Sequence, residues 1–239
     1  MERRLQRIKK ITSLLITVFF IYVSVSSQSI SLIQHIRLPM WADIDAYPGM
    51  PASENDFFVE KTKEDFDYAI KSIKSVSAYL INGMVYGWEF SYTPYDKTRG
   101  VKEYFEVKEI NPVEEIKSRI EYSSPWIDNN VLNCWCDFTR SEYEIQNYYR
   151  WSSIHNAVIQ GIGYGSVKDG FEGIKIAAEE ALKKAVRSHY RSIIKNKPKE
   201  IRGKVLIREE PLIGVDSGRY VINLDFFLEC DKIIEYKVF

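Results

Sequence analysis

The strongest pattern in the chain is an amphipathic repeat over residues 167–197. Apolar side chains recur there at helical spacing, while lysine, arginine and glutamate fall largely on the other side. Such a stripe predicts a long helix with one buried face. The buried stripe is rich in small residues that let a neighbouring backbone approach closely: Ala177, Ala178, Ala181 and Ala185. We therefore expect this helix to be a scaffold packed on a sheet.

A second amphipathic series follows an approximate capping box at Thr62 and Asp65, and it ends near Gly83. Residues 84–93 and 101–110 are then strand candidates, and the turn formers between them predict a hairpin. Alternate residues of the first strand are aromatic and project to one side: Tyr86, Trp88, Phe90 and Tyr92. We expect that side to be buried under a helix, and the alternative is an exposed aromatic platform.

The remaining elements are shorter. Residues 112–124 fit a helix or a strand equally well, and residues 140–152 predict a short helix rich in tyrosine. Further strands are predicted at residues 131–138, 154–166, 201–209, 219–229 and 233–238, and residues 211–218 are predicted to be the turn that links 201–209 to 219–229.

The two halves of the chain share an order of elements. Each has a long helix, then a Gly-x-Val sequence that opens a strand, then a turn and a second strand; these openings are Gly83-Met84-Val85 and Gly203-Lys204-Val205. The sequence thus predicts an α+β protein whose antiparallel sheet has the long helices packed on one face. We interpret residues 59–152 and 153–239 as two related helix–hairpin halves.

The N-terminus has the order of a secretory signal peptide. Five basic residues and one acidic residue precede an uncharged, mostly apolar run at residues 11–25. Residues 1–27 are then a signal peptide or, alternatively, an uncleaved anchor that would be the chain's membrane contact. Both interpretations predict an exported protein, periplasmic or associated with the cell envelope. Residues 28–58 lack a sustained period and contain prolines, so we interpret them as an extended segment leading into the fold.

The net charge and the cysteines argue against two kinds of site, one for nucleic acid and one for a metal ion. Removal of residues 1–27 takes away five basic residues and one acidic residue, which changes the net charge from 0 to −4. This charge argues against a nucleic-acid partner. In an oxidising compartment Cys134 or Cys136 could pair with Cys230. The Cys-x-Cys spacing has no second pair, so we expect no metal site and interpret both thiols as buried on one face of a strand.

The residues that carry chemistry are sparse. The series Gly161-x-Gly163-x-Gly165 lies where a phosphate loop would sit, but the lysine and the serine or threonine that clamp phosphate are missing. We interpret these glycines as a strand that allows close backbone approach. The sequence predicts no catalytic residue and no cofactor. A hydrolase using Glu89, Glu103 or Glu106 remains an alternative, and it requires two carboxylates facing each other across a cleft.

One resemblance concerns residues 154–229. The glycine series, the alanine-rich helix with Arg187, and the hairpin opened by Gly203-x-Val205 resemble the N-terminal domain of the flagellar T-ring protein and related small outer-membrane lipoproteins. The resemblance implies a non-catalytic envelope or assembly module with a helix packed on a sheet. The chain departs from the lipoproteins because its first cysteine is Cys134, so no cysteine lies directly after the apolar run to be lipidated.

A basic run after the long helix is the candidate binding surface. It consists of Lys195, Lys197, Lys199, Arg202 and Lys204. These side chains could contact an envelope protein or an anionic cell-wall polymer, although basic residues after a helix also complement its dipole. We expect a non-enzymatic envelope protein that acts as a structural or interaction module. The alternative is carbohydrate or peptidoglycan binding through exposed aromatic residues within 86–92 and 143–151.

Overall fold

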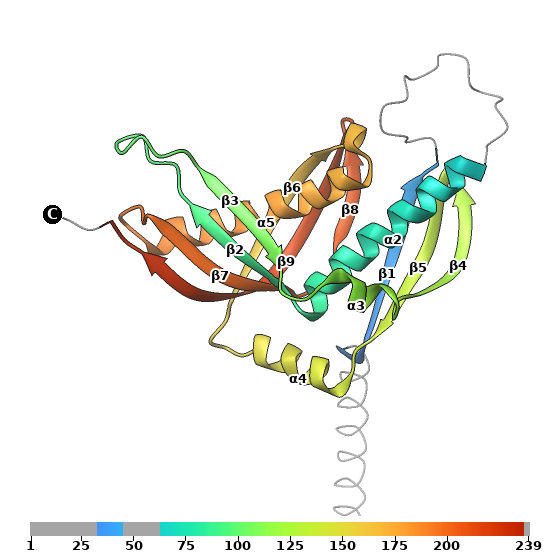
Figure 1. Cartoon of the computed structure of the whole chain (residues 1–239), viewed down its shortest axis with the longest axis horizontal. Helices are drawn as coiled ribbons and strands as arrows, with labels where there is room; N and C mark the ends of the chain where they lie inside the picture. The colour runs from blue at the N-terminus through green and yellow to red at the C-terminus, as the bar shows by residue number, and fades with distance from the viewer. Residues whose placement is uncertain (1–32, 45–62, 237–239) are drawn as a thin grey trace, which may run out of the picture.

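The chain forms a mixed α+β structure of two antiparallel sheets and the helices that cover them (Figure 1). The computed structural model describes residues 33–44 and 63–236. The predicted signal peptide or anchor at residues 1–27 and the predicted helix cap at Thr62 lie outside these residues.

The smaller sheet has three strands in the order β1-β5-β4, and the larger has six. The larger sheet runs β3-β2-β7-β9-β6, with the short strand β8 paired to β9 beyond the end of β7. All strand pairings among the described residues are antiparallel, which confirms the predicted fold class. The strands are β1 His35–Asp43, β2 Trp88–Thr93, β3 Tyr104–Glu109, β4 Glu121–Asp128, β5 Val131–Thr139, β6 Ala157–Ser166, β7 Glu200–Ile207, β8 Leu212–Asp216 and β9 Arg219–Ile234.

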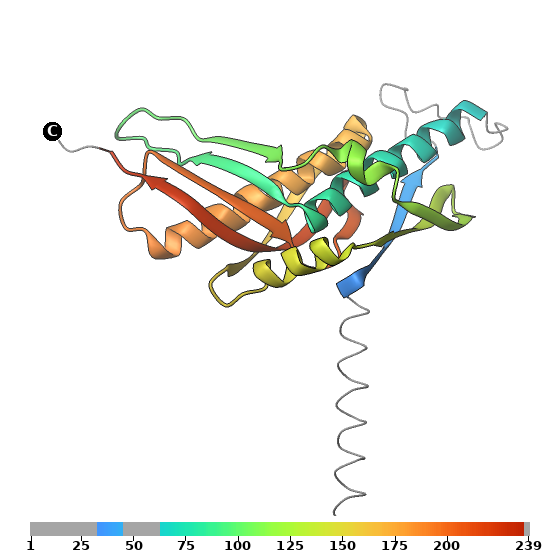
Figure 2. The same cartoon turned by 60° about the horizontal axis from the view of Figure 1, so that its bottom comes forward.

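The two long helices, α2 (Lys63–Val85) and α5 (Phe171–Ile193), cover one face of the larger sheet. Helix α2 extends from there over the smaller sheet and so joins the two (Figures 1 and 2). The opposite face of the larger sheet is partly covered by α4 (Glu142–Trp151), whose Tyr148 and Trp151 pack on two buried side chains of β7 and β9. The prediction of long helices on one face is therefore confirmed.

Helix α5 lies unusually close to β6. A Cβ atom added to Gly161, Gly163 or Gly165 would overlap the backbone of α5, at a carbonyl oxygen in each case. The α5 residues that face these glycines are themselves small, namely Gly173, Ala177, Ala181 and Ala185. The glycine series is thus the surface on which α5 packs, as the interpretation of close backbone approach predicted, and it does not form a phosphate loop.

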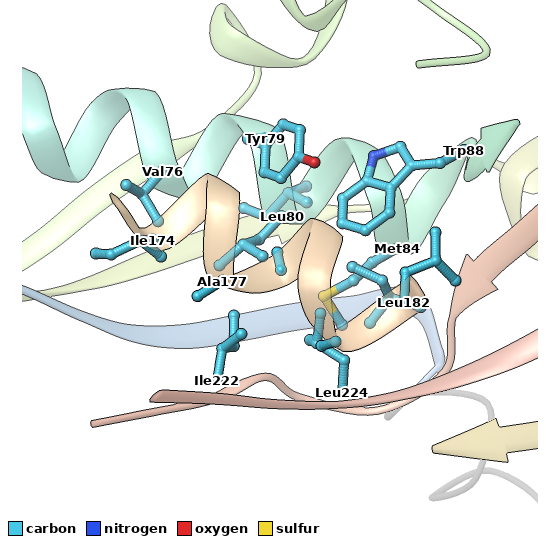
Figure 3. Close-up of a cluster of buried hydrophobic side chains, with 14 of the residues drawn as sticks. Val76, Tyr79, Leu80, Met84, Trp88, Ile174, Ala177, Leu182, Ile222 and Leu224 are labelled. Atoms are coloured by element: carbon cyan, nitrogen blue, oxygen red, sulfur yellow. The ribbon is translucent and has the colours of Figure 1, made fainter. Parts of the chain in front are cut away.

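The main core lies between the long helices and the sheets. Figure 3 shows side chains of α2, including Val76, Leu80 and Met84, meeting Ile174 and Leu182 of α5 above Ile222 and Leu224 of β9. The ring of Trp88 stacks on that of Tyr79 with 4.7 Å between centroids. Trp88, Phe90 and Tyr92 are buried, so the predicted burial of this side of β2 is confirmed and its use as an exposed platform is excluded.

The first predicted Gly-x-Val strand opening is wrong. Gly83, Met84 and Val85 belong to α2, and β2 begins only at Trp88. A glycine is required inside this helix because a Cβ at position 83 would lie 2.8 Å from the Trp88 ring. The helix ends at Val85 instead, and Gly87 follows it with a φ of 84°, which fits a left-handed helix stop; the Gly87 N–H donates to the Asn82 carbonyl at 3.1 Å.

Two strands occur where none was predicted. Residues 35–43, interpreted as an extended segment leading into the fold, form β1, in which side chains alternate between buried and exposed. The predicted turn at residues 211–218 contains β8, and the turn itself is confined to Ser217 and Gly218, both with positive φ. Both strands lie at sheet edges, where one side of the strand lacks a partner strand.

Several other helices and strands begin or end at residues that differ from the prediction. The ambiguous stretch 112–124 contains both a short helix, α3 (Val113–Lys117), and the first residues of β4. The predicted strands 219–229 and 233–238 merge into the single long strand β9. Each long helix is followed by an antiparallel strand pair, β2 with β3 and β7 with β9, in the predicted order. A common origin of the two halves stays a prediction.

Candidate binding sites

The five predicted basic residues do not form one surface. Arg202 and Lys204 lie on β7 and face away from α5, because the alternate residues Ile201, Gly203 and Val205 face the core. Both are neutralised by neighbours. Arg202 binds Glu200 through two hydrogen bonds of 2.7 and 3.1 Å, and the Lys204 ammonium lies 3.6 Å from the Glu89 carboxylate.

The other three basic residues lie in the loop between α5 and β7. Lys195 and Lys199 are exposed there. Lys197 donates a hydrogen bond of 2.9 Å to the Tyr95 carbonyl, and thereby ties the loop to the turn between β2 and β3. Lys197 lies on the α5 side of the sheet with Tyr92 and Glu103, whereas Arg202 and Lys204 lie on the opposite face, so proximity in sequence did not predict proximity on the surface.

The three glutamates proposed for a hydrolase also lie on two different faces of the sheet. Glu89 and Glu106 lie on the face of the sheet that carries Arg202, whereas Glu103 binds the Tyr92 hydroxyl on the opposite face at 2.9 Å. The Lys108 ammonium lies 3.0 Å from Glu106 and lowers the pKa of that carboxyl. A general acid requires a raised pKa, so the local electrostatics oppose this role for Glu106.

A first concave site, the α5 pocket, lies between the end of α5 and the hairpin of β2 and β3. It encloses about 170 Å³. Its charged side chains are Arg187, Arg191, Lys197 and Glu103, and the remainder of the lining is Tyr92, Pro94, Tyr95, Tyr190, Ile194, Asn196, Pro198 and Ile201. The pocket thus combines an apolar lining with three cations and one carboxylate.

Glu103 organises the inner part of the α5 pocket. It accepts the Tyr92 hydroxyl, and its carboxylate lies 3.6 Å from the Arg187 guanidinium. Burial raises the pKa of Tyr92, and the hydrogen bond to Glu103 raises it further, while the positive charges of Arg187 and Arg191 act in the opposite direction. Among the described residues, Arg191 has no ion-pair partner, so its charge remains available.

A second site, the α4 cleft, opens between α4 and the larger sheet and measures about 630 Å³. Its lining is polar and aromatic. It comprises Tyr86, Ile110, Asn111, Tyr143, Asn147, Arg150, Trp151, Ser153, His155, Asn156, Lys204 and Glu229. The cleft brings together aromatic residues of the two predicted stretches, and Tyr143 is 71% exposed at its edge. Rings next to amide and charged side chains can bind hydroxyl-rich ligands.

A buried polar network fixes the α4 cleft. Ser141 caps α4, and Glu144 completes a capping box by accepting the Ser141 N–H at 2.7 Å. Arg119 binds both oxygens of the Glu144 carboxylate, at 2.6 and 2.8 Å, and the Tyr86 hydroxyl donates to it at 2.9 Å. Burial and the hydrogen bond to Glu144 raise the pKa of Tyr86 to about 12, so this ring stays neutral.

The third site, the inter-sheet groove, lies between β1 and the face of the larger sheet opposite α5. It measures about 440 Å³ and is largely apolar. Its lining residues are Pro39, Trp41, Ile162, Glu210, Pro211, Leu212, Ile213, Gly214, Val221 and Asn223. Leu212 of β8 and Ile162 of β6 flank Asn223 of β9 on the same face, and Leu212 is 66% exposed. None of these residues was predicted as a site, because β8 was interpreted as a turn.

The cysteines do not build a metal site. Cys134 and Cys136 are buried on one face of β5 with 4.0 Å between sulfur atoms, as predicted, and Cys230 is exposed on β9. All three are free thiols, so the alternative pairing with Cys230 is not formed. Within residues 33–44 and 63–236, no three His, Cys, Asp or Glu side chains gather closely enough to hold a metal ion.

No helix in the same part of the chain has the length and apolar character needed to cross a membrane.

Comparisons with known proteins place the chain among relatives. An uncharacterized protein of Treponema pallidum (strain Nichols) is 26% identical over 204 residues, which cover 85% of this chain and 83% of that protein. No solved structure matches the chain. A protein-family model matches residues 24–236, which include both sheets and all three candidate sites. The chain therefore belongs to the family that this model defines.

Proposed function

We propose that the protein is an exported, non-enzymatic component of the cell envelope that acts as an interaction module for another envelope protein. The inter-sheet groove carries the proposal. Trp41, Ile162 and Leu212 offer apolar surface there, between edge strands of two sheets. Exposed apolar surface of this kind is typical of protein-binding sites, and the edge strands β1 and β8 can add backbone hydrogen bonds to an extended partner segment.

Three further observations support this function. The order of charged and apolar residues at positions 1–25 supports export. Strand β6, helix α5 and the strands β7 and β9 follow the order implied by the resemblance of residues 154–229 to the T-ring protein's N-terminal domain. The Lys108 ammonium lowers the pKa of Glu106, which opposes a general-acid role for that carboxyl.

Crosslinking in intact cells, followed by pull-down from the envelope fraction, tests the groove. Leu212→Asp places a charge on its apolar lining and is expected to remove the crosslinked partner. Val215→Asp is the matched control, because Val215 is exposed on the other face of the same short strand. An unchanged partner list for Leu212→Asp, or equal losses for both variants, argues against the groove. Lys199→Gln tests the predicted basic loop in the same assay.

Export is tested separately by N-terminal sequencing of the protein recovered from the envelope fraction. A chain that begins near Gln28 supports a cleaved signal peptide, and a chain that retains residues 1–27 within the membrane fraction supports an anchor. Recovery of the intact chain from the cytoplasm alone contradicts both.

A second candidate function is carbohydrate or peptidoglycan binding in the α4 cleft. The observation that favours it is the juxtaposition of Tyr86 and Tyr143 with the amides of Asn111, Asn147 and Asn156. Binding of soluble peptidoglycan fragments to purified protein is expected to weaken about tenfold in Tyr143→Ala, a loss typical of one removed stacking contact. Tyr149→Ala is the control, because Tyr149 is exposed on α4 but does not line the cleft. Equal binding by both variants argues against this function.

A further inference from the structure

The α5 pocket has the size and lining for a small ligand with one charged end. Its volume of about 170 Å³ admits only a few non-hydrogen atoms. Ile194 contributes apolar surface, and Pro94 and Tyr95 border it. A ligand that fits these walls carries a small aliphatic group, which excludes an entirely hydrophilic anion as the best match.

The charges around the α5 pocket are unbalanced. Arg187, Arg191 and Lys197 are opposed by one carboxylate, that of Glu103, which already accepts the Tyr92 hydroxyl. Lys197 is occupied by the Tyr95 carbonyl, and Arg187 is loosely paired with Glu103 at 3.6 Å. Arg191 lacks an ion-pair partner among the described residues, so a ligand carboxylate would complete the arrangement without displacing an existing salt bridge.

Arginine is suited to this recognition because its planar guanidinium can bind both oxygens of a carboxylate. Basic residues near the end of α5 also complement the helix dipole, but the dipole alone does not explain an apolar cavity beside them. Two arginines spaced four residues apart on α5 therefore face a cavity that an aliphatic carboxylate would fill.

We infer that the α5 pocket binds the C-terminal carboxylate of a peptide that ends in a small apolar residue. Arg191 binds the carboxylate, Arg187 adds to the positive field, and Ile194 contacts the last side chain. The preceding peptide residues lie outside the pocket, whose volume admits the terminal residue alone. The inference does not rest on the proposed envelope function, because it concerns a different surface and is measured on purified protein.

The test is a titration of the purified full chain, followed by NMR or calorimetry, with N-acetyl-alanyl-alanine and with its C-terminal amide as probes. The carboxylate form is expected to bind about tenfold more tightly than the amide, the difference typical of one charge-assisted hydrogen bond. Arg191→Gln is expected to remove this preference. Lys102→Gln is the matched control, because Lys102 is exposed next to Glu103 in the sequence but does not line the pocket.

Three results of this titration would contradict binding of a peptide carboxylate. Equal binding of the acid and the amide, the same loss in Lys102→Gln as in Arg191→Gln, or no binding of either probe at millimolar concentration overturns the inference. Inorganic phosphate is the third probe. If it competes as well as N-acetyl-alanyl-alanine, the pocket is a general anion site and the assignment to a peptide terminus is wrong.

Discussion

Gly163 of β6 and Ala177 of α5 lie in direct backbone contact, so close that a Cβ atom on the glycine would overlap the alanine carbonyl oxygen. The same relationship is repeated one turn away in each direction, by Gly161 with Ala181 and by Gly165 with Gly173. Glycines therefore recur at every second position of β6, and small residues recur at every fourth position of α5. Both repeats place small residues along the line where the strand and the helix touch. This contact determines the distance between α5 and the larger sheet.

The first prediction concerns this contact. Gly163→Ala forces α5 away from β6, because backbone atoms cannot give way as a flexible side chain can. We expect a loss of about 3 kcal/mol in the free energy of unfolding, the upper part of the usual range for overpacked cores. Urea denaturation measures it. Gly214→Ala is the control, since no atom lies within 4 Å of its added Cβ, and a similar loss there would refute the explanation.

Helix α5 and the glycines that it packs against could be predicted from the sequence, because the amphipathic repeat and the glycine series are both local patterns. The missed elements depend on contacts distant in the chain. Strand β1 has a regular alternation, but Pro39 interrupts its hydrogen-bonding pattern, and its pairing with β5 bridges about a hundred residues. Gly83 was interpreted as a helix end, whereas it is held inside α2 by Trp88 packed against it. Tertiary packing overrides local propensity in such cases.

The candidate sites were harder to predict than the fold. The basic run was visible in the sequence, but Lys197 lies in the loop on the α5 side of the sheet, whereas Arg202 and Lys204 of β7 lie on the opposite face. Arg187 and Arg191, which join Lys197 at the α5 pocket, belong to a helix that was interpreted as scaffold. The signal that could have identified them is their spacing of four residues near the helix end, on one side of α5.

The second prediction concerns acid stability. Burial alone would raise the pKa of Glu144, but hydrogen bonds from Arg119, the Ser141 N–H and Tyr86 outweigh it and lower the pKa to about 2. A carboxyl whose pKa is lower in the folded state stabilises the protein above its unfolded pKa of 4.5, and this contribution is lost as pH falls toward 2. It amounts to roughly 3 kcal/mol.

Chemical denaturation at pH values from 7 to 2 measures this loss. Glu144→Gln is expected to be less stable at pH 7 and to show a flatter decline below pH 5. Glu142→Gln, at an exposed position in the same helix turn, serves as the control and should follow the unmodified protein. If Glu144→Gln and the unmodified protein lose stability in parallel over this range, Glu144 is not the group responsible.

The third prediction concerns the thiols. Cys230 is exposed, whereas Cys134 and Cys136 are buried between β5 and α2. The hydrogen bond with Cys134 and burial raise the pKa of Cys136, which disfavours its reactive thiolate. A maleimide reagent is expected to modify one thiol in the native protein and three after unfolding in urea, as counted by mass spectrometry. Cys230→Ser should abolish native labelling, and rapid labelling of that variant would contradict the buried position of β5.

The last prediction concerns Arg140, a buried cation that connects three segments. Its guanidinium donates to the Ile33 carbonyl at 2.6 Å and to the Met84 carbonyl at 2.9 Å, and it lies 4.9 Å from the centre of the Tyr148 ring. The Met84 carbonyl belongs to the last turn of α2, where carbonyl groups lack partners within the helix. Arg140 therefore caps α2, supports α4 and holds the start of the described chain against both.

Arg140→Met keeps much of the side-chain volume but leaves both carbonyl groups without this donor. We expect a loss of about 3 kcal/mol in the free energy of unfolding, as for a buried acceptor deprived of its partner. Arg37→Met is the control, because Arg37 forms a partly exposed ion pair with Asp137 at 3.4 Å, which should contribute less than about 1 kcal/mol. Hydrogen exchange distinguishes the cause: the capping role requires faster exchange at the end of α2 and in α4, while the α5 and β6 amides keep their protection. Uniformly faster exchange would show instead that Arg140 stabilises the whole fold without a specific role at this junction.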